Sequence, residues 1–220
     1  FVLMLQFVAT VAVMSAIWTA GIWTLVPRWS LAAIVSFALI AAVRGARRAA
    51  SDFGGWALVQ TIVSLALLIV GGGAITEAWR AHQPPPIAII RLALPLEGDD
   101  LVVANGGSKL LLNAHQDTLD LSVPRHRFWQ GQSYGVDLVA MRASGTTSDG
   151  IRLSDPERYA IFGRPVHAPC AGMVVTLSND RPDLAVPKVD RKIMEGNHVR
   201  LRCNDVEVVL AHLKQGSVQV

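Results

Sequence analysis

Two side chains in the second half of the sequence carry groups that bind metal ions, one within an apolar, strand-like run and one directly after such a run. Asp137 is a carboxylate within the run YGVDLVAM, and a buried carboxylate must be paired or bound to a metal. His115 follows Asn113 on the same side of a preceding strand-like run. Imidazole nitrogen and carboxylate oxygen suit Zn²⁺ in a tetrahedral site, so we predict that His115 and Asp137 are zinc ligands. In the competing interpretation, Asp137 caps a loop and His115 is exposed.

A third candidate, His212, is selected by the expected pairing of the last two strand-like runs. Residues 198–203 alternate between polar and apolar side chains, the period-two pattern of a half-buried strand. Asn204-Asp205 suits a two-residue turn. This turn sets four opposed pairs, Cys203–Val206, Leu201–Val208, Val199–Leu210 and Asn197–His212. We therefore predict that His212 continues an inward, apolar row, whereas His198 shares its face with arginines and is solvated.

The segments that would position these residues are short and rich in β-forming side chains. Clusters of turn-forming residues separate them, and no helical periodicity of useful length is visible after residue 87. The strand-like runs are Leu101–Ala104, Lys109–Ala114, Tyr134–Met141, Gly172–Leu177, His198–Cys203 and Val206–Leu213. We predict a mainly antiparallel β domain over residues 95–220.

The first part of the sequence has a different character, because long apolar runs dominate it. The chain has 220 residues, of which 51% are hydrophobic. Phe1–Val26 and Ala57–Ile75 reach the roughly 20 residues that a membrane-spanning helix needs, and the shorter Leu31–Val43 reaches that depth with the four residues before it. We predict three transmembrane helices in residues 1–79, followed by a proline-rich linker over residues 80–94.

The charges between the predicted spans indicate an orientation in the membrane. Arg44, Arg47 and Arg48 lie between the second and third spans, whereas a single Arg28 lies between the first and second. Short cytoplasmic loops carry an excess of lysine and arginine. We therefore expect the β domain outside the cytoplasm, with membrane lipid around the N-terminal region.

The net charge and the cysteines bear on partners and on compartment. The net charge of +3 is small, and no basic stripe interleaved with aromatic residues is visible, so nucleic-acid binding is not expected. Cys170 and Cys203 would lie in an oxidising compartment. Two independent buried thiols are the expectation, and a disulfide between them is the alternative that the sequence leaves open.

Several motifs, taken in order, resemble the lysostaphin/LytM-type zinc metallopeptidases, which cleave peptide cross-links in bacterial peptidoglycan. The resemblance covers residues 95–220. Its strongest parts are QSYGVDL (132–138), FGRPVHAPCAGMVV (162–175), the turn into a strand at GNHV (196–199) and LAHLKQGSVQV (210–220). It implies the duplicated-hybrid-motif fold, a bound Zn²⁺, and a peptidoglycan peptide as substrate of a protein in the bacterial cytoplasmic membrane.

The family pattern implies a role for each candidate residue. Asp137 matches the zinc-binding aspartate, and His212 in Ala-His-Leu matches a catalytic histidine that does not bind metal. The common pattern places the first zinc ligand at Ser133, whereas a variant branch takes it from Asn-x-His, which matches Asn113-Ala114-His115. His126 is the second candidate for this ligand.

The largest departure from the family is that no His-x-His follows His212. This motif supplies a catalytic histidine and the third zinc ligand, so we expect the sequence to be a fragment of a longer protein. The implied function is a membrane-anchored zinc metalloendopeptidase that hydrolyses peptide bonds in peptidoglycan. The alternatives are a catalytically inactive LytM-like module that binds or regulates a cell-wall hydrolase, and a sugar-phosphotransferase domain of related fold. The expected location outside the cytoplasm disfavours the latter.

Overall fold

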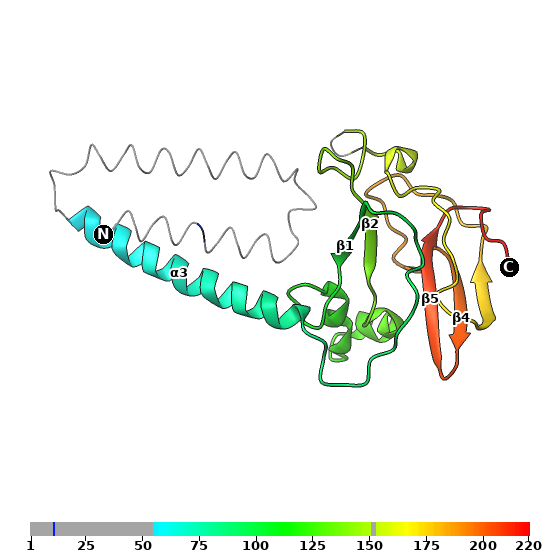
Figure 1. Ribbon diagram of the computed structural model, residues 1–220, viewed down its shortest axis with the longest axis horizontal. Helices are drawn as coiled ribbons and strands as arrows, with labels where there is room; N and C mark the ends of the chain where they lie inside the picture. The colour runs from blue at the N-terminus through cyan, green and yellow to red at the C-terminus, as the bar shows by residue number, and fades with distance from the viewer. Residues whose placement is uncertain (1–10, 12–54, 151–152) are drawn as a thin grey trace. The chain divides into compact units, whose positions relative to one another are not determined.

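The computed structural model describes residue 11, residues 55–150 and residues 153–220 (Figure 1). These residues divide into two compact units. The first unit consists of the described residues within Phe1–Ile87 and Val103–Leu138, and the second of those within Ala88–Val102 and Val139–Val220.

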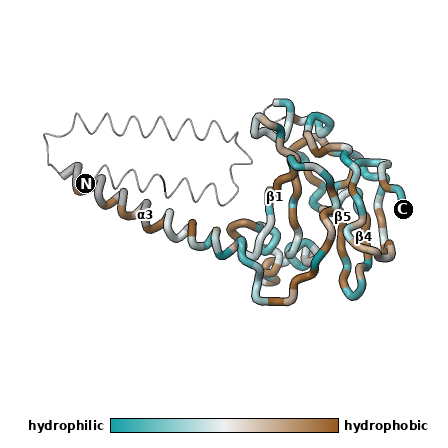
Figure 2. The backbone as a smooth tube through the Cα atoms, in the orientation of Figure 1, coloured by the Kyte–Doolittle hydropathy of each residue, from teal (hydrophilic) through white to brown (hydrophobic). Residues whose placement is uncertain are grey.

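The long helix of the first unit is α3 (Gly55–His82), which spans 28 residues. Figure 2 shows hydrophobic residues over much of its length and hydrophilic residues toward its C-terminal end. There Glu77 pairs with Arg80 at 2.7 Å, and the Ser108 N–H donates to the Ala81 carbonyl at 2.8 Å. This bond satisfies one of the carbonyls that a helix end leaves free. The prolines at 84–86 prevent the helix from continuing.

The prediction of three transmembrane helices needs correction. In the part of the chain that the structure describes, no helix has the length and the apolar character that crossing a membrane requires. Two of the predicted spans, Phe1–Val26 and Leu31–Val43, lie outside the described residues, apart from Val11. The third falls within α3, whose last turns are polar and pack on the first unit, with Ala78 and Ala81 buried. The predicted membrane localisation is corrected by the same finding.

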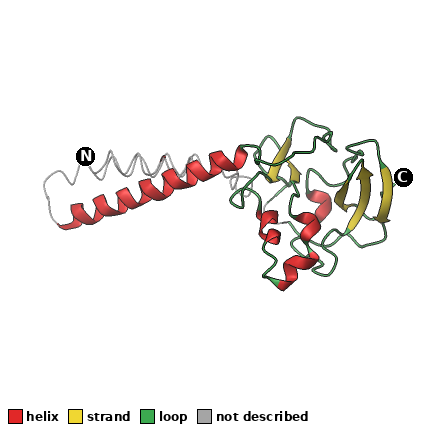
Figure 3. Ribbon diagram, turned by 90° about the horizontal axis from the view of Figure 1, so that it is seen from below, coloured by secondary structure: helices red, strands yellow, loops and turns green. Residues whose placement is uncertain are grey.

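Short elements make up residues 101–140 of the chain. Strands β1 (Leu101–Asn105) and β2 (Asp137–Ala140) form a two-stranded sheet. Between them lie three 3-10 helices, η2 (Ala114–Leu119), η3 (Pro124–Phe128) and η4 (Gln130–Gln132). Figure 3 shows these helical turns and the loops that connect them. A bend and a turn occupy residues 109–112 in place of the strand predicted over Lys109–Ala114, and η2 begins at Ala114.

The second unit is built on a three-stranded antiparallel sheet. Its strands are β3 (Met173–Ser178), β4 (Asn197–Cys203) and β5 (Val206–Leu213), in the order β3-β4-β5. A further 3-10 helix, η5, spans Pro156–Arg158. The buried core consists of Val199, Leu201 and Cys203 on β4, against which apolar residues of β5 and the loops pack.

The fold class predicted from the sequence is therefore wrong. The described residues contain one long helix and sheets of two and three strands, in place of a membrane region followed by a duplicated-hybrid-motif domain. The individual strand predictions are more accurate than the fold class. The bounds of β1, β3, β4 and β5 agree with the predicted runs to within one residue at each end.

The β4–β5 hairpin follows the predicted register over most of its length. Three of the opposed pairs are confirmed, namely Cys203–Val206, Leu201–Val208 and Val199–Leu210. Between Asn197 and Val199 the register shifts, so that Asn197 faces Leu213. A β-bulge inserts an extra residue and re-aims the side chains beyond it. The prediction that Asn197 faces His212 is therefore wrong.

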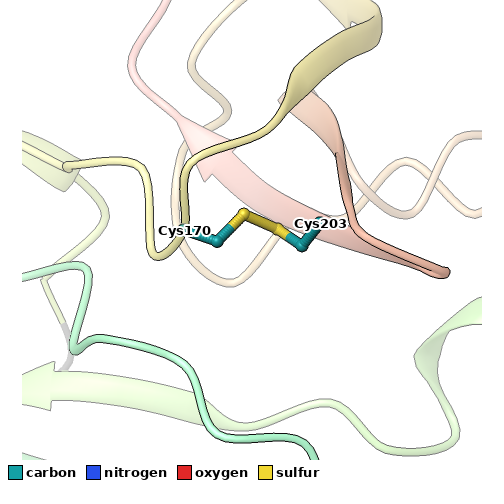
Figure 4. The surroundings of a disulfide bond; sticks show 2 residues. All are labelled: Cys170 and Cys203. Atoms are coloured by element: carbon teal, nitrogen blue, oxygen red, sulfur yellow. A yellow bond between two sulfur atoms is a disulfide. The ribbon is translucent and has the colours of Figure 1, made fainter.

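Two tertiary links stabilise the second unit. Cys170 and Cys203 form a disulfide with their Cα atoms 6.0 Å apart, which is the alternative that the sequence left open (Figure 4). A cross-link over 33 residues of sequence stabilises a protein by about 3–4 kcal/mol in the chain-entropy account. Arg164 donates to both carboxylate oxygens of Asp100 at 2.8 and 2.6 Å. These hydrogen bonds hold the pKa of Asp100 below its usual value.

Candidate metal site

His115 and Asp137 lie side by side in the first unit. His115 Nε2 is 3.5 Å from Asp137 Oδ1. The two side chains are 20% and 47% exposed, so the pair is accessible from solvent, mainly at the carboxylate. The structure thus brings together the two residues that the sequence predicted to be close. Their role as metal ligands stays a prediction.

Different elements position the two residues. Asp137 is the first residue of β2, so strand pairing with β1 fixes its backbone. His115 lies in the first turn of η2, which the Asn113 side chain caps by accepting the His115 N–H at 3.2 Å. Such a local bond from side chain to backbone competes with strand pairing. The strand predicted over Lys109–Ala114 is also absent, because Leu112 and Asn113 donate their N–H groups to the Lys109 carbonyl in a turn.

Asn113 is the most completely bonded side chain near the site. It is 2% exposed. Its Nδ2 donates to the carbonyl oxygens of Gly107 and Gly135 at 3.2 and 3.1 Å. Its Oδ1 accepts from the backbone N–H of His115 and lies 3.0 Å from His115 Nδ1. Asn113 therefore fixes the backbone of His115 and lies within hydrogen-bonding distance of its ring.

Asn105 connects the histidine to the carboxylate. Its Oδ1 accepts the Ala114 N–H at 2.8 Å. Its Nδ2 donates to Asp137 Oδ2 at 3.1 Å and lies 3.1 Å from His115 Nδ1. The sequence indicated only a turn at this position. The available signal was that Asn105 directly follows the apolar run Leu101–Ala104, as a polar residue at the end of a strand.

The spacing of the pair fits two ligands of one tetrahedral ion. Zinc bonds of about 2.0–2.1 Å to nitrogen and oxygen place neighbouring ligand atoms about 3.4 Å apart in a tetrahedron. The 3.5 Å between His115 Nε2 and Asp137 Oδ1 is close to this value. In the residues that the structure describes, no group of three or more histidine, cysteine, aspartate or glutamate side chains could hold a metal. A tetrahedral ion held here would take two of its four ligands from this pair.

His126, the second candidate for the histidine ligand, forms a different pair. Its side chain is 3% exposed, and its Nε2 lies 3.5 Å from Asp117 Oδ2. Its Nδ1 donates to the carbonyl oxygen of Asp120 at 2.9 Å. The Asp120 carboxylate accepts hydrogen bonds from Ser122, which lower its pKa. His126 is thus a buried residue within the 3-10 helical turns.

Ser133, where the common family pattern places a ligand, supports the site indirectly. It is 2% exposed, and its hydroxyl lies 2.7 Å from Thr118 Oγ1. The Thr118 hydroxyl donates to the carbonyl oxygen of His115 at 2.7 Å. Because a carbonyl only accepts, Ser133 is the donor to Thr118. This chain of hydroxyls holds the η2 turn that carries His115.

His212 belongs to the second unit, and its surroundings differ from the prediction. Its side chain is exposed, and its backbone has φ of 60°. Its N–H donates to the Glu195 carbonyl at 2.9 Å. The bulge in the hairpin turns Leu213 toward the apolar core instead. The inward orientation predicted for His212 is therefore wrong, because the register shift reverses which residue faces inward.

Asn197, proposed to face His212, has another role. It is 3% exposed, and its side chain accepts the Arg181 N–H at 2.9 Å. Its Nδ2 donates to the Arg181 carbonyl at 2.8 Å. It thereby holds the loop around Arg181 against the start of β4. His198, predicted to be solvated, is partly buried, and its Nδ1 bonds the Gly196 carbonyl at 3.0 Å.

The sequence matches no protein-family model, and no curated protein or solved structure shows a significant match. The resemblance to lysostaphin/LytM-type peptidases therefore rests on the motifs quoted above. What it implies for activity, cofactor and substrate is a proposal.

Proposed function

We propose that this protein is a zinc-dependent metallopeptidase that hydrolyses peptide bonds in bacterial peptidoglycan. The observation that supports this proposal is the His115–Asp137 pair, in which Nε2 and Oδ1 are 3.5 Å apart and the second ring nitrogen of His115 lies 3.0 Å from Asn113 Oδ1. Metal-binding histidines commonly bond their second ring nitrogen to a protein oxygen in this way. The motifs around Asp137 and His212 supply the peptidase interpretation.

Each residue has a defined part in this proposal. His115 presents Nε2, and Asp137 adds a negative charge that attracts a cation. Asn105 holds the second carboxylate oxygen of Asp137 and keeps the first available. A bound zinc ion would polarise the scissile carbonyl and lower the pKa of its water toward neutrality. The Ala-His-Leu motif is the basis for assigning proton transfer to His212, whose imidazole is exposed within the second unit.

Zinc binding by the whole chain is the first test of this function. Calorimetric titration of the purified protein with zinc should show binding, and His115→Ala and Asp137→Ala should abolish it. His212→Ala should retain zinc and lose any muropeptide hydrolysis that the wild-type protein shows. His167→Ala is the matched control, because His167 is a 60% exposed side chain with only a distant contact, 3.9 Å to Glu97. It should leave both measurements unchanged.

Two results would count against the proposal. Zinc binding that survives both His115→Ala and Asp137→Ala would refute the ligand assignment. A wild-type protein that binds no zinc would favour the alternative, a LytM-like module that binds or regulates a cell-wall hydrolase without metal. Retention on purified peptidoglycan in a sedimentation assay would then be the property to measure.

A further inference from the structure

The ring of His115 lies between two carboxamides that present opposite polarity to the same nitrogen. Asn113 Oδ1, an acceptor, is 3.0 Å from His115 Nδ1. Asn105 Nδ2, a donor, is 3.1 Å from the same atom. One ring nitrogen cannot donate to the first and accept from the second at once. Which bond forms therefore depends on where the imidazole carries its proton.

Backbone groups fix the orientation of both carboxamides. Flipping Asn113 would turn its oxygen toward two carbonyls, those of Gly107 and Gly135, and its NH₂ toward the His115 N–H. Flipping Asn105 would turn its NH₂ toward the Ala114 N–H and its oxygen toward the Asp137 carboxylate. Each flip replaces hydrogen bonds with contacts between like groups, so the network assigns both amides.

The two neutral tautomers of His115 therefore have different partners on both sides of the ring. With the proton on Nε2, this N–H faces Asp137 Oδ1, and Nδ1 accepts from Asn105. With the proton on Nδ1, this N–H donates to Asn113, and the Nε2 lone pair faces the carboxylate. The first arrangement places a donor opposite a negative oxygen and is favoured without a cation. The second leaves Nε2 free and is required when a cation lies between Nε2 and Asp137.

We propose that Asn105 and Asn113 act as a tautomer selector for His115. Asn105 stabilises the resting form, in which Nε2–H pairs with Asp137. Asn113 stabilises the ligand form, in which Nε2 is free to bind metal. Both asparagines are positioning residues, since they act through the ring of His115. This inference rests on the proposed metal-binding function, although the resting tautomer can be measured without any metal.

The test is the tautomer of His115, measured from the ¹⁵N chemical shifts of its imidazole in the whole protein at a pH where the ring is neutral. Metal-free wild type should carry the proton on Nε2, and addition of zinc should move it to Nδ1. Asn105→Ala removes the donor to Nδ1 and should shift the metal-free ring toward the Nδ1–H form. Asn113→Ala should hold the ring in the Nε2–H form and weaken zinc binding by about 10- to 100-fold, the range for outer-shell partners of a metal ligand.

Gln116→Ala is the matched control. This exposed carboxamide shares the Gly107 carbonyl with Asn113. Gln116→Ala should leave the tautomer of His115 unchanged. If Asn113→Ala does not fold, the comparison of Asn105→Ala with the wild type still tests the proposal. An Nδ1–H ring in the metal-free wild type, or no shift in Asn105→Ala, would overturn the selector even if zinc binds. If zinc does not bind and Asn105→Ala still moves the proton, the selector stands and the metallopeptidase proposal fails.

Discussion

The described residues of the first unit include two histidine–aspartate pairs with the same separation and different surroundings. Nε2 lies 3.5 Å from a carboxylate oxygen in both His115–Asp137 and His126–Asp117. The Nδ1 of His126 faces a backbone carbonyl, which can only accept, so the hydrogen bond fixes its proton there. The Nδ1 of His115 faces one acceptor and one donor. The distance within a pair therefore does not define its chemistry, because the group behind the ring decides which tautomers are accessible.

Burial separates the two pairs further. His126 is 3% exposed and lies beside Trp129, with ring centroids 6.3 Å apart. His115 and Asp137 are both partly exposed. A buried histidine with a fixed proton suits a structural role, whereas an accessible pair with two tautomers suits a ligand site. The following predictions test this division.

The largest expected effect is on metal affinity, and it should be confined to one pair. Asp137→Asn removes a charged ligand, so zinc affinity should fall by more than roughly 100-fold, beyond the range seen for outer-shell changes. Asp117→Asn makes the same substitution in the other pair and should leave zinc affinity unchanged. Calorimetric titration of both variants measures the difference. Equal losses in the two variants would show that the pairs are not distinct in function.

The second prediction concerns stability, and here the larger effect is expected from the His126–Asp117 pair. His126→Ala leaves the Asp120 carbonyl without its partner and removes a buried ring, so the free energy of unfolding should fall by about 1–3 kcal/mol. His115→Ala should cost less, because this ring is more exposed. Urea unfolding of both variants, followed by circular dichroism, makes the comparison. A larger loss in His115→Ala would contradict the structural role assigned to His126.

Local alternation predicted the β4–β5 hairpin well, and it failed where a single residue altered the pattern. The buried row Val199, Leu201 and Cys203 follows from the period-two sequence, and its partners on β5 follow from the turn. The bulge beside Asn197 leaves no trace in that alternation, yet it turns His212 outward. The sequence also could not decide whether Cys170 and Cys203 form a disulfide, because this depends on the distance in space between two residues that are 33 positions apart.

The sequence predicted that His115 and Asp137 lie together, and it did not predict the side chains that support them. Asp137 was identifiable as a carboxylate within an apolar run, and His115 as a histidine directly after one. The capping by Asn113 and the link through Asn105 depend on how η2 meets the two-stranded sheet. Periodicity carries no information about such contacts between side chain and backbone. For the same reason it predicted a strand where Asn113 begins a 3-10 helix.

A third and smaller effect is expected from the hydroxyl group of Thr118, which supports the His115 pair and not the His126 pair. Thr118→Val removes the hydroxyl that donates to the His115 carbonyl and should cost about 1 kcal/mol of stability, the usual net value of one hydrogen bond. It should also weaken zinc binding, because the turn carrying His115 loses its support. Thr118→Ser keeps the hydroxyl and should restore both. If valine and serine behave alike in denaturant titrations, the hydroxyl chain through Ser133 does not support the site.

The smallest expected effect concerns pH and the carbonyl that holds His126. Ser122 keeps the folded-state pKa of Asp120 below the unfolded value of about 3.9. A depressed carboxyl pKa contributes stability that is present above the unfolded pKa and is lost as the pH falls through the folded pKa. Wild type should therefore lose a small increment of stability over that acidic window, and Asp120→Asn, which does not titrate there, should lack it. The difference between their urea midpoints, measured from neutral pH downward, should shrink below the unfolded pKa. If the difference between the two urea midpoints stays constant with pH, the charge of Asp120 does not stabilise the turn that presents its carbonyl to His126. The His126 pair would then rely on backbone geometry alone.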